Sequence, residues 1–150
     1  MIRRIIIVFT AIFVISGLIL LGKNLFDGKQ ATATFGDEKI KLDVAKTTKE
    51  HEVGLSNRKS LKENQGMIFL FDKPDYYSFW MKNMKFPIDI IFLNGNRIIT
   101  IHKNVQPPAS SNASLPLFTS SQPADKIIEL PAGKSDKLDL KEDDTVSLTL

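Results

Sequence analysis

The apolar run of residues 5–22 constrains this chain most, because it carries no charged side chain over eighteen positions. As an α-helix rising 1.5 Å per residue it would be about 27 Å long, close to the roughly 30 Å hydrocarbon core of a bilayer. Arg3 and Arg4 precede the run, and flanking positive charge is retained on the cytoplasmic side. The sequence therefore predicts a signal anchor, a transmembrane helix over residues 1–22, with residues 23–150 outside the cytoplasm.

Two other interpretations of the run are less favoured. A cleaved signal peptide has a shorter apolar centre, about 7–15 residues, followed closely by small residues at the cleavage site. Here the A-x-A pattern of residues 31–33 lies about ten residues downstream of the run. A buried helix of a globular domain would present a polar face, which the run lacks. We therefore expect an uncleaved anchor.

Composition excludes several classes of site. The chain has no cysteine, which excludes disulfide scaffolds, thiolate zinc sites and thiol nucleophiles. Its two histidines, His51 and His102, are expected on the surface, so we predict no metal site and no cofactor. With Arg3 and Arg4 set aside, 18 basic residues stand against 17 acidic ones. That balance predicts no nucleic-acid partner, since nucleic-acid binding calls for a basic patch.

Residues 31–150 are predicted to form a β-rich domain after a short linker, residues 23–30. Two alternating stretches, residues 31–35 and 39–45, flank Gly36-Asp37 and predict a hairpin at the start of the domain.

Asn94-Gly95 gives the strongest local signal, because Asn-Gly between two strand-like runs is typical of a tight hairpin. If these two residues form the loop, Leu93 pairs with Asn96 and Ile91 with Ile98. One face then carries Ile91, Leu93 and Ile98, and the other carries Ile88, Ile90, Phe92, Ile99 and Ile101. Both faces are apolar, which predicts a central hairpin covered on two sides, as in a barrel or sandwich.

The remaining signals complete the predicted fold. A single short helix should begin at Thr47 or Thr48 and end near Gly54. Residues 107–123 are rich in proline and serine and predict a long surface loop. Further strands are expected over residues 67–71, 76–81, 125–130 and 144–150. The fold class predicted is mainly β: a compact β-barrel or sandwich-like domain with one short helix, preceded by an N-terminal transmembrane helix.

Five short motifs follow one another along the chain in an order that is typical of a protein family. They are Gly54-Leu55, Gly66-Met67, Phe79-Trp80-Met81-Lys82-Asn83, Pro87-Ile88-Asp89-Ile90 and Glu129-Leu130-Pro131-Ala132-Gly133. Over residues 31–150 this pattern resembles the domain of unknown function 192, also known as uncharacterised protein family 0127. The resemblance implies a compact β-rich barrel with one short helix, often behind a secretion or anchor segment, and implies no particular activity.

The motif around Trp80 suggests a binding surface. On an extended segment over residues 79–83, Trp80 and Lys82 share one face, while Phe79, Met81 and Asn83 share the other. An indole ring can stack on a sugar or apolar ring, and a lysine can hold an anion. The alternative is a Trp80 buried in the barrel wall, with Lys82 extending outward.

Asp89 lies inside an apolar strand, on the same face as Ile91, where a charge needs a partner or water. Arg58 and Lys82 are the candidate partners. An Arg58–Asp89 ion pair could fasten the helix turn onto the barrel, or the three charges could form the polar floor of a ligand pocket. The candidate ligand-binding residues are Arg58, Trp80, Lys82, Asn83 and Asp89.

Three functions are compatible with these features. The first is an extracytoplasmic binding or accessory module for an envelope glycan or a protein partner. The second is a hydrolase that uses Asp89 with Glu129 or His51 as acid and base. The third is a purely structural domain, in which every named polar residue fastens the core.

Overall fold

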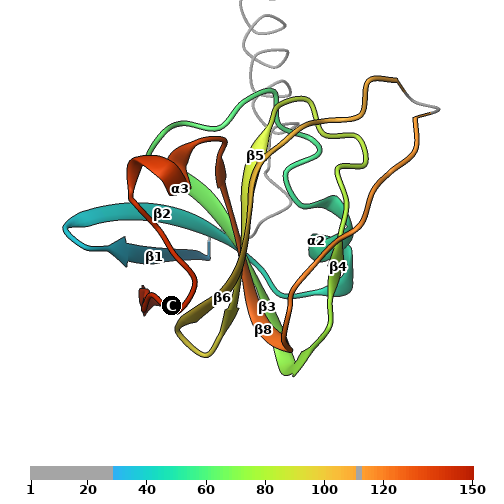
Figure 1. The fold of residues 1–150 in the computed structure, drawn as a ribbon. Helices are drawn as coiled ribbons and strands as arrows, with labels where there is room; N and C mark the ends of the chain where they lie inside the picture. Colours follow the sequence, from blue (N-terminus) through green and yellow to red (C-terminus); the bar gives the residue numbers. More distant parts are fainter. Residues whose placement is uncertain (1–28, 111–112) are drawn as a thin grey trace, which may run out of the picture.

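The computed structural model describes residues 29–110 and 113–150 (Figure 1). Within these two stretches no helix combines the length and apolar character needed to cross a bilayer. The predicted anchor, residues 1–22, and residues 23–28 of the predicted linker lie outside the described residues.

Most of the described chain is β-structure. In order, the elements are β1 (Gln30–Phe35), β2 (Glu38–Ala45), α2 (Thr48–Val53), β3 (Gln65–Asp75), β4 (Ser78–Phe79), β5 (Ile88–Asn94), β6 (Arg97–Val105), β7 (Phe118–Thr119), β8 (Ala124–Pro131), α3 (Lys134–Lys137) and β9 (Ser147–Thr149). Seven strands form one curled sheet in the order β6-β5-β8-β3-β2-β1-β9, and β4 pairs with β7 separately. All pairs are antiparallel except β2–β3, whose connection contains α2. The mainly β class is therefore confirmed.

The C-terminal segment bridges the two edges of this half-barrel. β9 pairs with β1 at one edge. Just before β9, the N–H of Ile98 on β6 donates to the carbonyl of Asp144 at 2.8 Å, and the N–H of Val146 donates to the carbonyl of Asn96 at 2.8 Å. Residues 143–149 thus bond to the edge strand β6 and, as β9, form the opposite edge beside β1, which limits the exposure of unpaired backbone groups.

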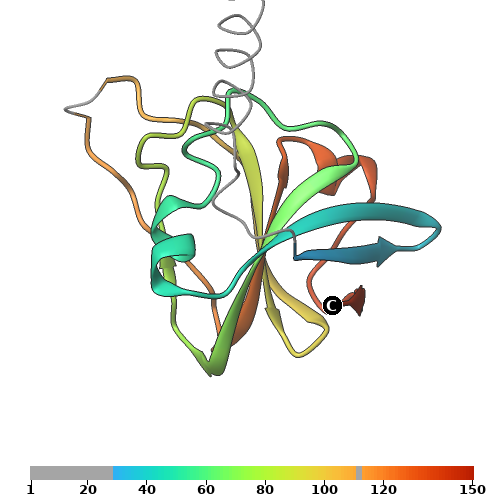
Figure 2. The same cartoon turned by 180° about the vertical axis from the view of Figure 1, so that it is seen from behind.

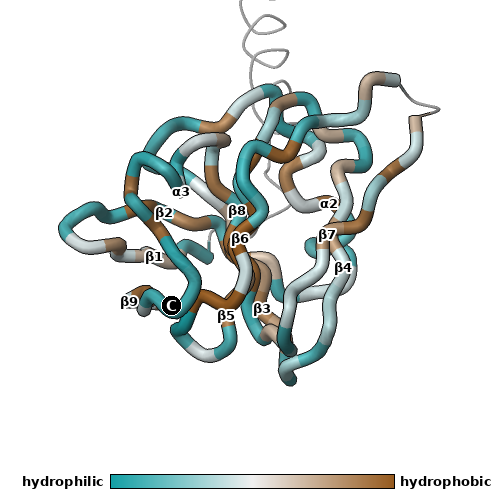
Figure 3. Tube along the Cα trace, in the orientation of Figure 1, coloured by the Kyte–Doolittle hydropathy of each residue, from teal (hydrophilic) through white to brown (hydrophobic). Residues whose placement is uncertain are grey.

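Each face of the sheet has its own hydrophobic core, and the central strands that separate them are among the most apolar segments of the molecule (Figure 3). One core is largely aliphatic and is covered by the C-terminal segment; it includes Ile40, Leu42, Ile68, Ile91, Leu130 and Val146. The other is rich in aromatic and sulfur side chains, including Met67, Phe69, Met81 and Phe92. Figures 1 and 2 show α2 and β4 on this second side, with α3 and the C-terminus on the first.

The β5–β6 hairpin forms as predicted, with a different register. Its predicted central position is wrong, because β6 is the edge strand of the sheet. Asn94 pairs with Arg97 and Leu93 with Ile98, so the loop is Gly95-Asn96, displaced by one residue. Phe92 then pairs with Thr100, which leaves a bulge on β6. Because of this extra residue, Ile101 packs on the aliphatic side with its partner Ile91, not on the side of Ile99 as predicted.

Other local predictions are confirmed or corrected. The β1–β2 hairpin turns at Gly36-Asp37. α2 begins after Thr47, whose hydroxyl accepts the N–H of Glu50 while the Glu50 carboxylate accepts the N–H of Thr47, a capping box. The single-helix prediction is wrong, because α3 adds a second short helix. The strand predicted over residues 76–81 is reduced to the two residues of β4, and that over 144–150 to the three of β9.

Candidate functional site

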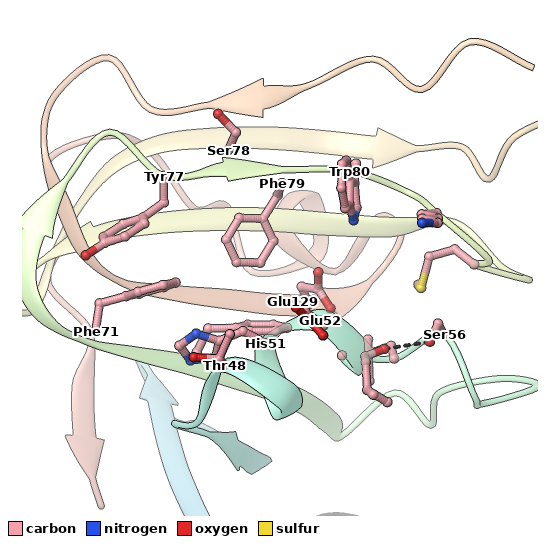
Figure 4. A pocket seen from close by; sticks show the side chains of 16 residues that line it. Thr48, His51, Glu52, Ser56, Phe71, Tyr77, Ser78, Phe79, Trp80 and Glu129 are labelled. Atoms are coloured by element: carbon pink, nitrogen blue, oxygen red, sulfur yellow. Dashed lines mark hydrogen bonds between the residues drawn. The ribbon is translucent and has the colours of Figure 1, made fainter.

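A cleft of about 230 Å³ opens on the aromatic side of the sheet, between α2 and β4 (Figure 4). α2 and the turn after it form one wall, and β4 with the residues around it forms the other. β3 contributes Phe69 and Phe71, and β8 contributes Glu129. The β2–α2–β3 connection thus places a helix over the sheet and leaves a gap between this helix and the β4–β7 pair.

Several aromatic rings line the cleft. Phe69 and Phe71 are two positions apart on β3, so both side chains point to this face. The ring of Phe71 stacks on that of Tyr77 with centroids 3.7 Å apart. Phe69 meets Phe79 edge-on at 4.9 Å. These contacts join β3 to the β4 wall of the cleft.

Glu129 supplies the one acid among the strand residues that line this cleft. It pairs with Met67 on β3 and Ile90 on β5, and all three side chains lie on the aromatic side. Glu129 is 5% exposed, and its Oε2 has no hydrogen-bond partner among the described residues. Burial raises the pKa of Glu129 to about 8, although the nearby Arg58 guanidinium lowers it. At neutral pH this carboxyl therefore keeps its proton.

Trp80 and Lys82 lie at the edge of the cleft and line it together. Trp80 is 52% exposed, so the predicted alternative of a tryptophan buried in the barrel wall is wrong. The Lys82 ammonium is 5.5 Å from the centroid of the Trp80 ring, within reach of a cation–π contact. The predicted Trp–Lys surface thus exists.

Asn83 is not among the residues that line the cleft. The chain is extended only as far as Phe79, and Asn83 has a φ of 60° in the turn that follows. Its side chain is exposed, so it is not paired with Phe79 and Met81 on one strand face as predicted.

Asp89 is fully buried on the aliphatic side, away from the cleft. Its Oδ1 accepts the N–H groups of Asn104 at 2.8 Å and Gly133 at 3.1 Å. Its Oδ2 accepts the N–H of Ser135 at 2.8 Å, at the start of α3. These three backbone donors replace the partners predicted for it, so Asp89 joins β5 to β6 and α3 and has no place in the cleft floor.

Arg58 forms its ion pair with Asp43 on β2. The predicted Arg58–Asp89 pair is therefore wrong. Since Arg58 lowers the pKa of Glu129, its charge acts on the cleft floor from the turn after α2.

Both histidines are half-buried and hydrogen-bonded, which corrects the prediction of surface histidines. The Nε2–H of His51 donates to the carbonyl of Ala45 at 3.1 Å, and its ring lies 4.5 Å from that of Phe71. Nε2 of His102 is 2.8 Å from the carbonyl oxygen of Thr119. Over the two described stretches, no group of three or more histidine and acidic side chains is placed to hold a metal ion.

Glu129 is a candidate site residue that the sequence alone does not place in the binding site. The sequence predicts a role for it only as an alternative partner of Asp89 in a hydrolase. A signal was present: Glu129 interrupts the apolar run of residues 127–130, just as Asp89 interrupts β5. The two interruptions together predict two buried carboxyls. Only the fold shows that Asp89 has hydrogen-bond partners and that Oε2 of Glu129 has none among the described residues.

Comparison with known proteins places this chain in a family. The model for domain of unknown function 192, described as an uncharacterized ACR, matches residues 31–148, and the chain belongs to this family. A crystal structure of a protein of unknown function from Novosphingobium aromaticivorans is 30% identical, with a TM-score of 0.67 over 79% of this chain and 83% of that one. Another, from Sinorhizobium meliloti 1021 and provisionally described as a transcription regulator, is 25% identical, with a TM-score of 0.73 over 84% and 97%. Among curated proteins, none matches this sequence.

Proposed function

We propose that this protein is a membrane-tethered, extracytoplasmic binding domain and that the cleft between α2 and β4 is its ligand site. The observation that carries the proposal is the carboxyl of Glu129, a residue that lines the cleft and whose buried Oε2 has no hydrogen-bond partner among the described residues. A buried polar atom left unsatisfied costs about 1–3 kcal/mol. A ligand group that bonds to it would recover part of this cost.

The rim supports the same proposal. Trp80 presents half of its surface to solvent beside the cleft, and exposed aromatic surface next to a pocket is typical of a contact site. The ligand we propose is an envelope component, either a glycan or a segment of a partner protein. A purely structural domain gives no reason for an exposed indole next to an unsatisfied acid.

The tether and the location outside the cytoplasm are supported by the sequence. The apolar run of residues 5–22, with Arg3 and Arg4 before it, has the length and charge asymmetry of a signal anchor. A fusion tests the proposed topology: a reporter enzyme that is active only outside the cytoplasm is attached after Leu150. Reporter activity is expected, and its absence would contradict the proposed topology.

The hydrolase predicted from the sequence pairs Asp89 with Glu129 or His51 as acid and base, and both of these partners line the cleft on the aromatic side, away from Asp89. Asp89 and Glu129 lie on paired strands but point to opposite faces of the sheet. Two carboxyls separated by a β-sheet cannot act on one bond, so we do not propose this function.

Thermal unfolding in the presence of envelope components tests the binding function. The full chain is purified in a polyoxyethylene detergent, which has no sugar head group, and heated with uncharged glycan fragments and envelope peptides. A ligand at 100 times its dissociation constant stabilises by about 2.7 kcal/mol, which raises Tm by several degrees. The shift should disappear in Trp80→Ala and persist in Tyr76→Ala, which removes an equally exposed ring outside the cleft. An equal shift in both variants, or none with any ligand, would contradict the proposal.

A further inference from the structure

We propose that the cleft binds an uncharged sugar ring, with a ring hydroxyl hydrogen-bonded to Oε2 of Glu129 and the apolar C–H face of the sugar against Trp80. This inference rests on the proposed binding function and names the chemical class of its ligand.

The distribution of polar groups favours a polyhydroxylated ligand. Polar residues line the cleft on the α2 side, on its floor and beside Trp80: Thr48, Glu52, Ser56, Glu129 and Lys82. Figure 4 shows the hydroxyl of Ser78 pointing away from the other side chains of the cleft. A fatty acid or an aliphatic amine has its polar group at one end and would leave most of these side chains facing hydrocarbon. A sugar ring carries hydroxyls around its edge and an apolar face, which matches polar groups spread between aromatic rings.

The size of the cleft limits the ligand that it can enclose. Its volume of about 230 Å³ lies below the roughly 300–1,000 Å³ of sites for drug-sized ligands. The cleft therefore encloses one ring, and any further residues of a glycan would extend past Trp80 into solvent.

The charges around the cleft favour an uncharged ligand. Glu129 keeps its proton at neutral pH and can donate to a hydroxyl oxygen, whereas an ammonium group would require it to ionise. The other titratable or charged groups that face or act on the cleft are His51, Glu52, Tyr77, Lys82 and Arg58. Arg58 is paired with Asp43, and Glu52 offsets Lys82, so no excess of either sign selects an ion.

Trp80 offers a direct readout, because it is the only tryptophan in the chain. Its fluorescence can be titrated in the full chain, again in a polyoxyethylene detergent, with two disaccharides that differ in charge and in two N-acetyl groups. These are N,N′-diacetylchitobiose, which is uncharged, and its deacetylated form, whose amino groups carry positive charge at pH 6. Cellobiose serves as a second uncharged probe.

We expect at least one uncharged disaccharide to change Trp80 fluorescence saturably and to bind at least tenfold more tightly than the deacetylated one. Glu129→Gln keeps an uncharged hydrogen-bonding group and should bind within about threefold of wild type at pH 7. Glu129→Leu removes it and should weaken binding at least tenfold. Between pH 7 and pH 9 the wild-type affinity should fall about tenfold as Glu129 loses its proton, while that of Glu129→Gln stays constant.

Three outcomes would overturn this inference. Tighter binding of the deacetylated disaccharide, lost in Glu129→Gln, would make the cleft a site for organic cations and leave the proposed binding function intact. Uncharged sugars that bind Glu129→Leu as well as wild type would remove Glu129 from recognition. If envelope peptides raise the Tm but no disaccharide changes Trp80 fluorescence, the sugar assignment is wrong and the proposed binding function stands. If no envelope component raises the Tm and no disaccharide changes Trp80 fluorescence, the sugar assignment and the proposed function are both wrong.

Discussion

Two buried acids on neighbouring strands point to opposite faces of one sheet and differ in their hydrogen-bond partners. Asp89 on β5 pairs with Leu130 on β8, and the next pair joins Ile90 to Glu129. On the aliphatic face, the carboxylate of Asp89 accepts three backbone N–H groups. On the aromatic face, Oε2 of Glu129 has no partner among the described residues. A buried carboxylate whose oxygens both accept hydrogen bonds from the protein has a structural role. A buried carboxyl that lines a cleft and has an oxygen without a hydrogen-bond partner indicates a ligand site.

The cores around these acids differ in the same sense. The aliphatic side is closed by the C-terminal segment, which bonds to β1 and to β6. The aromatic side is covered by two short elements, α2 and the β4–β7 pair, with the cleft between them. We therefore expect substitutions on the aliphatic side to affect stability most, and those at the cleft to affect ligand binding and pH dependence.

The largest effect should come from Asp89→Ala. This change leaves three buried N–H groups without an acceptor and should lower the free energy of unfolding by about 3–5 kcal/mol. Asp89→Asn is the matched control, because its amide oxygen can still accept from Asn104 and Gly133, and it should cost less. Urea unfolding measures both. A loss below about 1 kcal/mol for Asp89→Ala would contradict the structural role assigned to this carboxylate.

The pH dependence of stability should show that Glu129, unlike Asp89, is buried without hydrogen-bond partners for its Oε2 among the described residues. Its pKa is about 8 in the folded chain, above the ordinary value of 4.5, so the folded state holds this proton more tightly than the unfolded state. The contribution of Glu129 to the free energy of unfolding should therefore fall by roughly 1 kcal/mol per pH unit between pH 5 and pH 8. Glu129→Gln should lack this slope in urea unfolding across that range. Parallel profiles for wild type and variant would mean that the carboxyl is solvated.

Gly66→Ala should have an intermediate effect that acts through the aliphatic side. A Cβ at Gly66 would lie 2.6 Å from the carbonyl oxygen of Glu129 and 2.7 and 2.8 Å from the Cδ2 atoms of Leu42 and Leu130. Because one of these contacts is with backbone, the strands must shift, at a cost of about 1–3 kcal/mol. Thermal or urea unfolding measures it. An unchanged stability would show that β3 and β8 are less closely packed than described.

Trp80→Ala should have the smallest effect on stability, about 1–2 kcal/mol, because half of the residue already faces solvent and only the other half of its apolar surface is buried. Phe92→Ala, which empties a fully buried position on the same side of the sheet, is the comparison and should cost about 3–5 kcal/mol. Urea unfolding of the two variants separates a binding residue from a core residue. Equal losses would place Trp80 in the core.

The elements were largely predictable from the sequence because their signals are local. Alternation and the turn residues Gly36-Asp37 and Asn94-Gly95 predict both hairpins, although the second loop is displaced by one residue. Thr47 and Thr48 predict the start of α2 to within one residue. The register of β6 was not predictable, since a bulge near Ile99 depends on how both faces of the strand pack. α3 was missed because its first turn is held by Asp89, a residue more than forty positions earlier.

Part of the candidate site, Trp80 and Lys82, could be predicted from the sequence. Trp80 and Lys82 are two residues apart, so a local pattern was enough to predict that they lie close together, although they follow β4 and are not on an extended strand. The partners of Arg58 and Asp89 depend on which strands become neighbours, and opposite charges in the sequence could be matched in several ways. Glu129 completes the site only because α2 and β4 are brought over β8, an arrangement that no local pattern contains.

A carboxyl-carbon NMR titration of Glu129 tests the central claim most directly, with the resonance assigned by comparison with Glu129→Gln. The account predicts a midpoint near pH 8 for the free protein and a higher midpoint when an uncharged disaccharide is bound, because that ligand favours the protonated acid. A midpoint between pH 4 and 5 would show an ordinary solvated carboxylate, and the distinction between the two faces of the sheet would then be lost.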